Sequence, residues 1–303
     1  MLATWKVEPA LAAFVFAIVC AHGQFTLTKE QVIAYTAKNP YERFPDGRPK
    51  VPDELIEKVK GLVIEEAYGQ VRGKGFPNQF AGDWKVLNPS KKLVGRAFTV
   101  QFMPARPDVA EGMQAEATKN GIGRLRNQTV IDMLGPDDVI VVDLFGKTDG
   151  GTLFGKTDGG TFVGDKLAYY IWKTTGTGMI VDGGMFWLGR IIPTGMPAYY
   201  RGTGPDALSN VMLTGINIPI RIGNVTVMPG DVVLGDEEGL LFIPPHLVKD
   251  AIDAAESTRA RDEWIKQKMD LGKYKSSELY GRPRDPALAK ELEEYIKTHQ
   301  PKK

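Results

Sequence analysis

Cysteine and histidine are nearly absent from this chain of 303 residues. Cys20 is its one cysteine, so no disulfide can form within a single chain, and the three histidines are His22, His246 and His299. A zinc site of cysteine and histidine ligands is therefore disfavoured, and a catalytic triad would have to use one of these few side chains. Any chemistry must depend mainly on carboxylates, arginine, lysine, backbone amides or a metal held by oxygen atoms.

An excess of charge of either sign is also lacking. Lys and Arg number 38 and Asp and Glu number 37, which gives a net charge of +1. A balanced chain has no overall field to attract nucleic acid or an acidic membrane, so we expect no nucleic-acid partner. Hydrophobic residues make up 43% and charged residues 25%, which is typical of a folded protein and excludes disordered and collagen-like classes.

The first 23 residues have the pattern of an export signal. Lys6 is the one cation before an apolar run over 10–19, which is too short to span a bilayer as a helix. Residues 21–23, Ala-His-Gly, resemble a cleavage site. We therefore expect a signal peptide over 1–23, export to a periplasm or beyond, and no membrane association after cleavage. The alternative is a buried N-terminal helix.

The remaining chain alternates between helical and strand patterns without a linker, which predicts an α/β protein. We expect an N-terminal arm and helix over 24–69, one α/β domain over 70–245 and a C-terminal helical extension over 246–303. Strands are expected over 92–103, 139–145 and 179–182, followed by a β-rich stretch over 198–244. The expected helices cover 52–68, 113–118, 129–133, 164–175, 247–269 and 287–296.

A nine-residue tandem repeat interrupts the domain. Residues 144–152 and 153–161 have the same sequence, Leu-Phe-Gly-Lys-Thr-Asp-Gly-Gly-Thr. Where the copies meet, the run from Gly150 to Thr157 matches a phosphate-binding P-loop. A P-loop needs a helix that starts at its Lys-Thr, but consecutive glycines follow here and disfavour one. The repeat therefore predicts an enlarged mobile loop, whose second copy can be deleted without loss of the fold, and not a nucleotide site.

Two stretches carry a resemblance to a known family. The first is Val139–Phe145, then Gly164-Asp165-Lys166-Leu167, then Thr177–Gly183; the second is the Pro-Gly-Asp-Val-Val hairpin within Met228–Pro244. In this order they resemble the RraA-like proteins, the family of the regulator of ribonuclease activity A and of 4-hydroxy-4-methyl-2-oxoglutarate aldolases. The resemblance covers about 93–248. It implies a compact swivelling α/β/β/α domain, here with an added N-terminal arm and helix and C-terminal helices, that assembles as a homotrimer or hexamer.

The active members of that family are metal-dependent lyases. They cleave 4-hydroxy-2-oxo acids to pyruvate or decarboxylate oxaloacetate, and both reactions leave an enolate. A Mg²⁺ or Mn²⁺ ion and an arginine stabilise that charge without any cysteine or histidine. The family pattern is an acidic residue, twenty further residues, and then Arg-Asp. The acid holds metal-bound water, the Arg binds the substrate and the second Asp binds the metal.

This sequence departs from the pattern at the second position. Asp165 supplies the acid, but Phe186 and Trp187 occupy the Arg-Asp positions. A phenylalanine cannot pair with a carboxylate, and a tryptophan cannot bind Mg²⁺. Arg190, three residues further on, is a candidate replacement. The resemblance thus assigns a catalytic role to Asp165, the metal position to Trp187, and substrate binding to Gly164, Asp165, Lys166, Leu167 and the position of Phe186.

Three functions remain open at this point. The first is an exported RraA-like protein that binds a small oxo acid or related carboxylate, with catalysis lost or altered and with no cofactor if it is inactive. The second is an active divalent-metal-dependent aldolase or decarboxylase that uses Asp165, Asp182, Arg190 or a neighbouring subunit's Glu237. The third is a non-catalytic oligomeric module that binds another protein.

Several of these residues also have plain structural interpretations. Asp165 could cap the helix that starts beside it, and Asp182 could belong to a turn at the end of a strand. Asp236 and Glu237 could be only a hairpin turn, although family sites lie at subunit interfaces. His246 follows two prolines and is expected at the start of a helix.

Overall fold

The structure is a computed structural model, and it describes residues 26–144 and 161–299. The expected signal peptide lies outside the described residues, and so does the tandem repeat except for Leu144 and Thr161. The expectations for these two segments therefore stay predictions. Within the described ranges, no helix has both the length and the apolar character needed to cross a bilayer.

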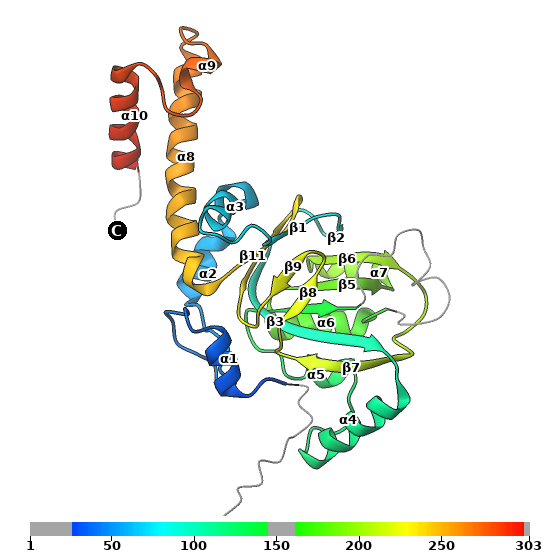
Figure 1. The fold of residues 1–303 in the computed structure, drawn as a ribbon. Coiled ribbons are helices and arrows are strands. Elements are labelled where there is room, and N and C mark those ends of the chain that lie inside the picture. The colour runs from blue at the N-terminus through cyan, green and yellow to red at the C-terminus, as the bar shows by residue number, and fades with distance from the viewer. Residues whose placement is uncertain (1–25, 145–160, 300–303) are drawn as a thin grey trace, which may run out of the picture.

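A mixed β-sheet forms the centre of the molecule (Figure 1). Its strands are β1 (Phe80–Ala81), β2 (Lys85–Leu87), β3 (Leu93–Pro104), β4 (Asp138–Asp143), β5 (Met179–Met185), β6 (Ala198–Thr203), β7 (Val211–Ile216), β10 (Val232–Asp236) and β11 (Gly239–Ile243). They follow the order β1-β11-β10-β3-β4-β5-β6-β2, and β7 also pairs with β3. The four central strands from β3 to β6 are parallel, and the flanking pairs are antiparallel. A separate hairpin consists of β8 (Ile220–Ile222) and β9 (Val225–Val227).

Helices and the small hairpin cover the two faces of this sheet. The helices are α1 (Lys29–Tyr35), α2 (Asp53–Lys60), α3 (Ile64–Gly73), α4 (Pro107–Lys119), α5 (Asn127–Ile131), α6 (Asp165–Thr175), α7 (Leu188–Ile191), α8 (Val248–Asp270), α9 (Ser276–Leu279) and α10 (Pro286–His299). Helices α5 and α6 pack on the parallel strands, whereas α2, α3 and α8 pack on β10 and β11. The β8–β9 hairpin covers the opposite face of β4 and β5. The expected α/β fold with additional helices at both ends is confirmed.

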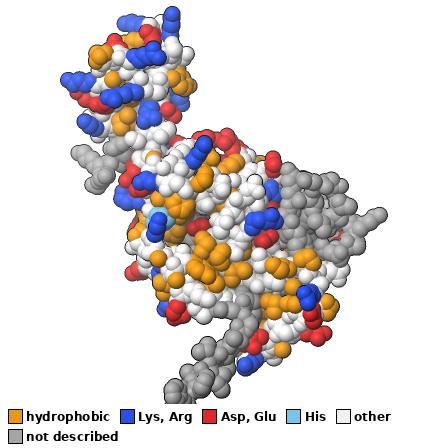
Figure 2. Space-filling model, viewed as in Figure 1, with side chains coloured by type: hydrophobic (Ala, Val, Ile, Leu, Met, Phe, Trp, Pro, Cys, Tyr) orange, Lys and Arg blue, Asp and Glu red, His pale blue; other side chains and the backbone are white. Residues whose placement is uncertain are grey.

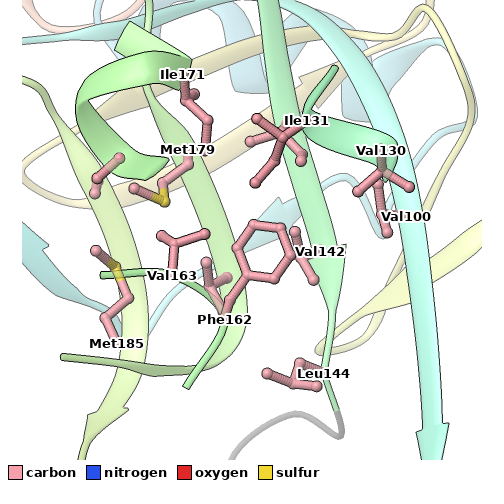
Figure 3. Close-up of a cluster of buried hydrophobic side chains, with 14 of the residues drawn as sticks. Val100, Val130, Ile131, Val142, Leu144, Phe162, Val163, Ile171, Met179 and Met185 are labelled. Atoms are coloured by element: carbon pink, nitrogen blue, oxygen red, sulfur yellow. The ribbon is translucent and has the colours of Figure 1, made fainter. Parts of the chain in front are cut away.

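The alternation of side chains along β4 explains why the four residues between its terminal aspartates are all apolar. Ile140 and Val142 face α5 and α6, where Phe162 fills the space between strand and helices (Figure 3). Val139 and Val141 face the other way, toward the β8–β9 hairpin. A strand covered on both faces is therefore apolar on both faces along its middle. The continuous hydrophobic run therefore predicted this buried strand correctly.

The helix predicted over 52–68 is wrong in one respect, because the chain forms two helices there. Helix α2 ends before Gly61, and the chain then places Leu62 in the core with 1% of its surface exposed. A new helix begins at Ile64, whose N–H donates to the Asp236 carboxylate at 3.0 Å. That acceptor lies 172 residues away in the sequence, so local periodicity could not reveal the break.

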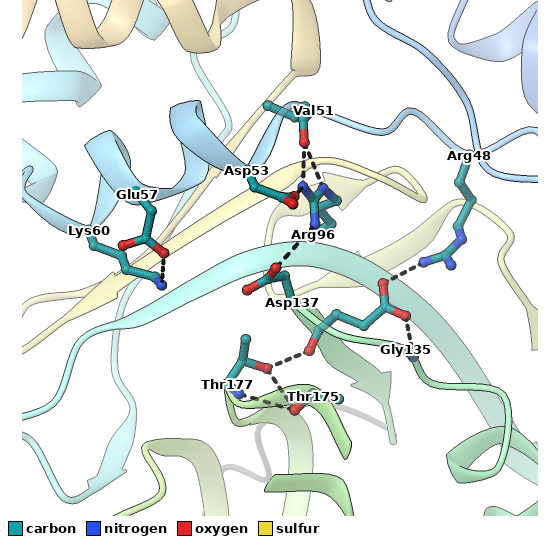
Figure 4. Close-up of polar contacts among 11 residues, drawn as sticks. Arg48, Val51, Asp53, Glu57, Lys60, Arg96, Gly135, Asp137, Thr175 and Thr177 are labelled. Carbon is teal, nitrogen blue, oxygen red and sulfur yellow. Dashed lines mark hydrogen bonds and ion pairs between the residues drawn. The ribbon is translucent and has the colours of Figure 1, made fainter. Parts of the chain in front are cut away.

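The N-terminal residues before α2 are bound closely to the sheet. Arg48 forms a buried ion pair with Asp138 of β4, with 2.9 Å between Nη1 and Oδ1. Arg96 of β3 donates to the Val51 carbonyl and pairs with Asp53 at the start of α2 (Figure 4). This segment, which the sequence predicted as an arm, also contains the short helix α1. Its first turn has a capping box in which Thr28 and Gln31 exchange hydrogen bonds.

The C-terminal helices form a hairpin that projects from the domain. Helix α8 starts against the sheet and continues beyond it, and α10 runs alongside its far half (Figure 1). A small separate core joins the two helices around Trp264, Leu288 and Leu292. The extension is therefore stabilised at its far end by its own contacts, independently of the main core.

Candidate functional site

A cavity of about 460 Å³ opens beside the start of α6. Of the residues predicted to bind substrate, Gly164, Leu167 and Phe186 line this cavity. Asp165 and Lys166 do not line it; Asp165 is half-buried and Lys166 is exposed. The structure thus brings together three of the five expected binding residues.

The backbone before α6 is held in place from three sides. The Phe162 N–H donates to the Gly184 carbonyl of β5 at 3.0 Å, and its own carbonyl accepts from the Asn127 amide at 2.8 Å. Thr161 donates to the Asp206 carbonyl through both its N–H and its hydroxyl. These contacts fix the point where α6 begins. The first turn of the helix, with its free N–H groups, is therefore part of a rigid wall.

Phe186 covers the start of this helix. A Cβ placed on Gly164 would lie only 3.0 Å from the Phe186 ring, so the ring packs directly on the glycine. A side chain at position 164 would require the Phe186 ring to move by a few tenths of an ångström. The resemblance to the family predicts a substrate-binding arginine at position 186. Phe186 contributes an apolar wall at this position.

Trp187 and Arg190 form a second cluster at the surface. Trp187 is 48% exposed and has a left-handed backbone with φ of 59°. The Arg190 guanidinium lies 4.3 Å from the centre of its ring and 3.5 Å from Asp165 Oδ2. A non-glycine residue in this conformation is strained by about 1–2 kcal/mol. With this backbone conformation the indole points outward, over Arg190, and away from the cavity.

Asp165 is not the helix cap that one interpretation of the sequence suggested. The N-cap position of α6 belongs to Gly164, and Asp165 is the first helical residue. Its carboxylate instead meets Arg190, at 3.5 Å from Nη1. An acid in the first turn is favourable beside the positive end of the helix. Asp165, which the resemblance predicts to be the catalytic acid, is therefore paired with a cation of the chain itself.

The residues present do not fit a divalent metal at the family position. A Mg²⁺-type ion needs several oxygen ligands, and Trp187 supplies none where the pattern requires a carboxylate. Asp165, the other acid of the pattern, faces a guanidinium. Among the residues that the structure describes, no group of three or more His, Cys, Asp or Glu side chains could hold a metal ion. The side chains around the cavity therefore support no catalytic step through a metal.

Two arginines that the sequence analysis missed also line the cavity. Arg124 and Arg126 lie in the loop between α4 and α5, and no described acidic side chain forms an ion pair with either. Gln114 of α4 anchors this loop, donating to the Gly123 carbonyl at 2.7 Å and accepting from the Leu125 N–H at 3.0 Å. In the sequence, the available signal for this part of the site was a pair of arginines in a short loop before a helix. Nothing in the sequence placed that loop at the same cavity as Gly164.

Asp182 is unavailable as a replacement catalytic group. It lies inside β5, so its assignment to a turn at the strand end is wrong. Its fully buried carboxylate accepts from Arg201 at 2.6 Å and from the Gly223 N–H at 3.1 Å. Both oxygens are therefore occupied. Asp182 joins β5 to β6 and to the turn of the β8–β9 hairpin, and it does not line the cavity.

The β10–β11 hairpin turn is confirmed at Glu237 and Glu238. Asp236 is buried, and its carboxylate accepts from the N–H groups of Ile64 and Glu238, so it cannot reach another subunit. Glu237 is exposed. The expectation for His246 is also confirmed, because it lies in a short 3-10 helix, Pro245–Leu247, directly before α8.

A mixed α/β domain with a Gly-Asp loop at the start of a helix and a Pro-Gly-Asp hairpin defines the class of this protein. The sequence pattern of the RraA-like family, described as Aldolase/RraA, matches residues 64–242, which is more than half of the chain. The chain belongs to the RraA-like family.

Two curated proteins are similar to this chain. It is 29% identical over 180 residues to a putative 4-hydroxy-4-methyl-2-oxoglutarate aldolase of Halalkalibacterium halodurans, covering 59% of this chain and 72% of that protein. It is 25% identical over 189 residues to the protein DlpA of Legionella pneumophila, covering 62% of this chain. The match spans only 27% of DlpA.

Solved structures agree with the fold. RraAS2 of Streptomyces coelicolor, described as an unusual member of the RraA family of RNase ES inhibitors, superposes with a TM-score of 0.58 at 26% identity, covering 75% of this chain and 99% of that one. An uncharacterized protein of Pseudomonas syringae gives the same TM-score at 19% identity, covering 86% of this chain and 98% of that one. The second likeness concerns the fold alone.

Proposed function

We propose that this RraA-like protein binds a small carboxylate, an oxo acid or a related compound, in the cavity beside α6, and that lyase catalysis there is lost or altered. The observation that carries the proposal is the Phe186 ring packed on Gly164. Phe186 stands where the family pattern has its substrate-binding arginine, so that arginine is absent from the cavity. Asp165 pairs with Arg190 instead.

Two arginines in the lining support carboxylate binding. Arg124 and Arg126 are exposed residues that line the cavity, and an arginine is suited to bind a planar carboxylate through two parallel hydrogen bonds. Much of the remaining lining is apolar, including Phe102, Leu167 and Phe186. A ligand with a carboxylate at one end and an apolar body at the other matches these two parts of the lining. Such a ligand would be held without a metal.

Loss of catalysis follows from the chemistry of the replaced groups. Cleavage beside a keto group places negative charge on an enolate oxygen, and removing one charge-stabilising group commonly costs about 10²–10³-fold in rate. In this chain, Phe186 and Trp187 occupy the two positions where the family pattern has charge-stabilising groups. Arg190, the candidate replacement, contacts Asp165 and the Trp187 ring instead of lining the cavity.

Calorimetric titration with pyruvate, oxaloacetate and phenylpyruvate tests the binding proposal. We expect at least one of them to bind, and Arg124→Gln with Arg126→Gln to weaken that binding by about tenfold or more, since each bond to a charged group contributes about 1.5–3 kcal/mol. Arg106→Gln is the matched control, because Arg106 is exposed and pairs with Asp108 away from the cavity. Equal weakening by the control would overturn the assignment, and so would the absence of binding by all three acids.

Export and assembly complete the proposal. The pattern of residues 1–23 supports export through a signal peptide, and the family resemblance supports a homotrimer or hexamer. Export also argues against a cytoplasmic ribonuclease as a protein partner. A small ligand in the cavity is therefore better supported than binding to such a partner.

A further inference from the structure

A second cavity, of about 490 Å³, lies far from α6 along the chain. Its walls come from the end of α1, the segment after α3, the turn between β9 and β10, and the residues before α8. Figure 2 shows hydrophobic side chains gathered on this face of the domain, between α1 and the β8–β9 hairpin. The volume is within the usual range of small-molecule sites, about 300–1,000 Å³. The proposed function does not use this cavity, and the Asp…Arg-Asp pattern does not include its residues, although Asp231 belongs to the Pro-Gly-Asp hairpin of the family resemblance.

One carboxyl group reaches into this largely apolar space. Asp231 has only 3% of its surface exposed and lines the cavity. Its Oδ2 accepts from the Met228 N–H at 2.9 Å, and no described residue donates to Oδ1. Burial raises the pKa of Asp231 to about 7, and the hydrogen bond from Met228 opposes that rise. Oδ1 has no described donor and is not fully enclosed, so it is open to a hydrogen-bond donor in the cavity.

The surrounding side chains suit a cation with an apolar body. The rings of Phe76 and Tyr35 and the thioether of Met228 line the same space, and aromatic faces attract ammonium groups. Lys38, His246 and the Tyr35 phenol are the other titratable groups that line the cavity, and Lys38 acts with burial to lower the pKa of His246. None of them is among the groups that shift the pKa of Asp231. Asp231 is the one carboxyl side chain that lines this cavity among the described residues.

We propose that this cavity is a second binding site, for a small primary amine with an apolar body whose ammonium group donates to Asp231 Oδ1. The ammonium supplies the donor that the buried carboxyl lacks. The body of the ligand packs against Phe76, Met228 and Pro244.

Three probes that share one body and differ in the head group test this proposal: phenethylamine, phenethyl alcohol and hydrocinnamate. We expect the full-length protein to bind the amine in a calorimetric titration and to discriminate against the alcohol and the anion. Asp231→Asn keeps an oxygen for the Met228 N–H but removes the charge, and it should weaken amine binding by about tenfold or more. Glu237→Gln, an exposed acid on the next hairpin turn, is the control and should bind like wild type.

A second variant keeps the test decisive if Asp231→Asn fails to fold. Ala37 is exposed and lines the cavity, so Ala37→Trp should block it and abolish amine binding without disturbing the core. Failure of the wild type to bind the amine at millimolar concentration would overturn the proposal. Equal binding of all three probes, or undiminished amine binding by either cavity variant, would also overturn it.

Discussion

Replacement of buried charged residues should lower the free energy of unfolding more than other replacements. Arg48 and Asp138 have side chains that are 6% and 3% exposed, and they join the N-terminal segment to β4. Arg48→Met leaves Asp138 buried with the Gly135 N–H as its remaining described donor, and we expect a loss of about 3–5 kcal/mol of unfolding free energy. Denaturant titration measures it. The double variant Arg48→Met/Asp138→Asn should regain part of the loss; if it is no more stable than the single variant, the pair is not the cause.

The raised pKa of Asp231 predicts how the stability of the protein changes with pH. Its pKa is about 7 in the folded protein against an ordinary value of 3.8. Between these values the folded state holds the proton more tightly than the unfolded state, so stability falls as pH rises from about 4 to about 7, by up to about 1.4 kcal/mol per pH unit. Asp231→Asn should flatten this part of the stability profile and make the protein relatively more stable near pH 8. Parallel profiles for the two proteins, measured in urea, would contradict the assignment.

At the scale of elements, the local patterns predicted most of the fold. The apolar run of β4, the periodicity of α6 and the Pro-Gly-Asp hairpin each depend on neighbouring residues, and each is present. The break between α2 and α3 depends on a hydrogen bond from Ile64 to Asp236, and the cavity depends on the α4–α5 loop lining the same space as Gly164. Such contacts join distant parts of the chain. Periodicity and motif spacing do not encode them, which is why Arg124 and Arg126 were missed.

The C-terminal hairpin should unfold locally. Leu292 belongs to the small core between α8 and α10, whereas Leu241 belongs to the main core under α3 and α8. Replacing either leucine by alanine removes about 2–5 kcal/mol of local stability. We expect Leu292→Ala to accelerate hydrogen exchange in α10 and the far half of α8 alone, and Leu241→Ala to lower the stability of the whole domain. Global destabilisation by Leu292→Ala would show that the hairpin is part of one cooperative unit.

At the scale of the whole molecule, we predict a trimer or hexamer in solution. Tyr169, Tyr170, Trp187 and Ile192 are large hydrophobic residues that are 46–49% exposed on α6 and at the two ends of α7, beside the candidate site. Aromatic residues gathered at one surface are typical of subunit interfaces. Light scattering of the purified protein tests this assembly. A stable monomer at micromolar concentration would contradict it.

Whether the family's lyase chemistry persists depends on two positions, and the structure makes them suitable for an experiment. Phe186 is half-buried and Trp187 is 48% exposed, so neither is a core residue and polar replacements there should leave the core intact. Aspartate also tolerates a left-handed backbone better than tryptophan does. The double variant Phe186→Arg/Trp187→Asp should therefore fold, which a thermal melt checks first.

The most direct test of the account is the rate of oxaloacetate decarboxylation with Mn²⁺, measured with and without a chelator. We predict no metal-dependent turnover by the wild type and chelator-sensitive turnover by Phe186→Arg/Trp187→Asp, reduced again when Asp165→Ala is added. Robust metal-dependent turnover by the wild type would contradict the account of a lost or altered site. A folded double variant that neither binds metal nor turns over would contradict the placement of the Arg-Asp pair at these two positions.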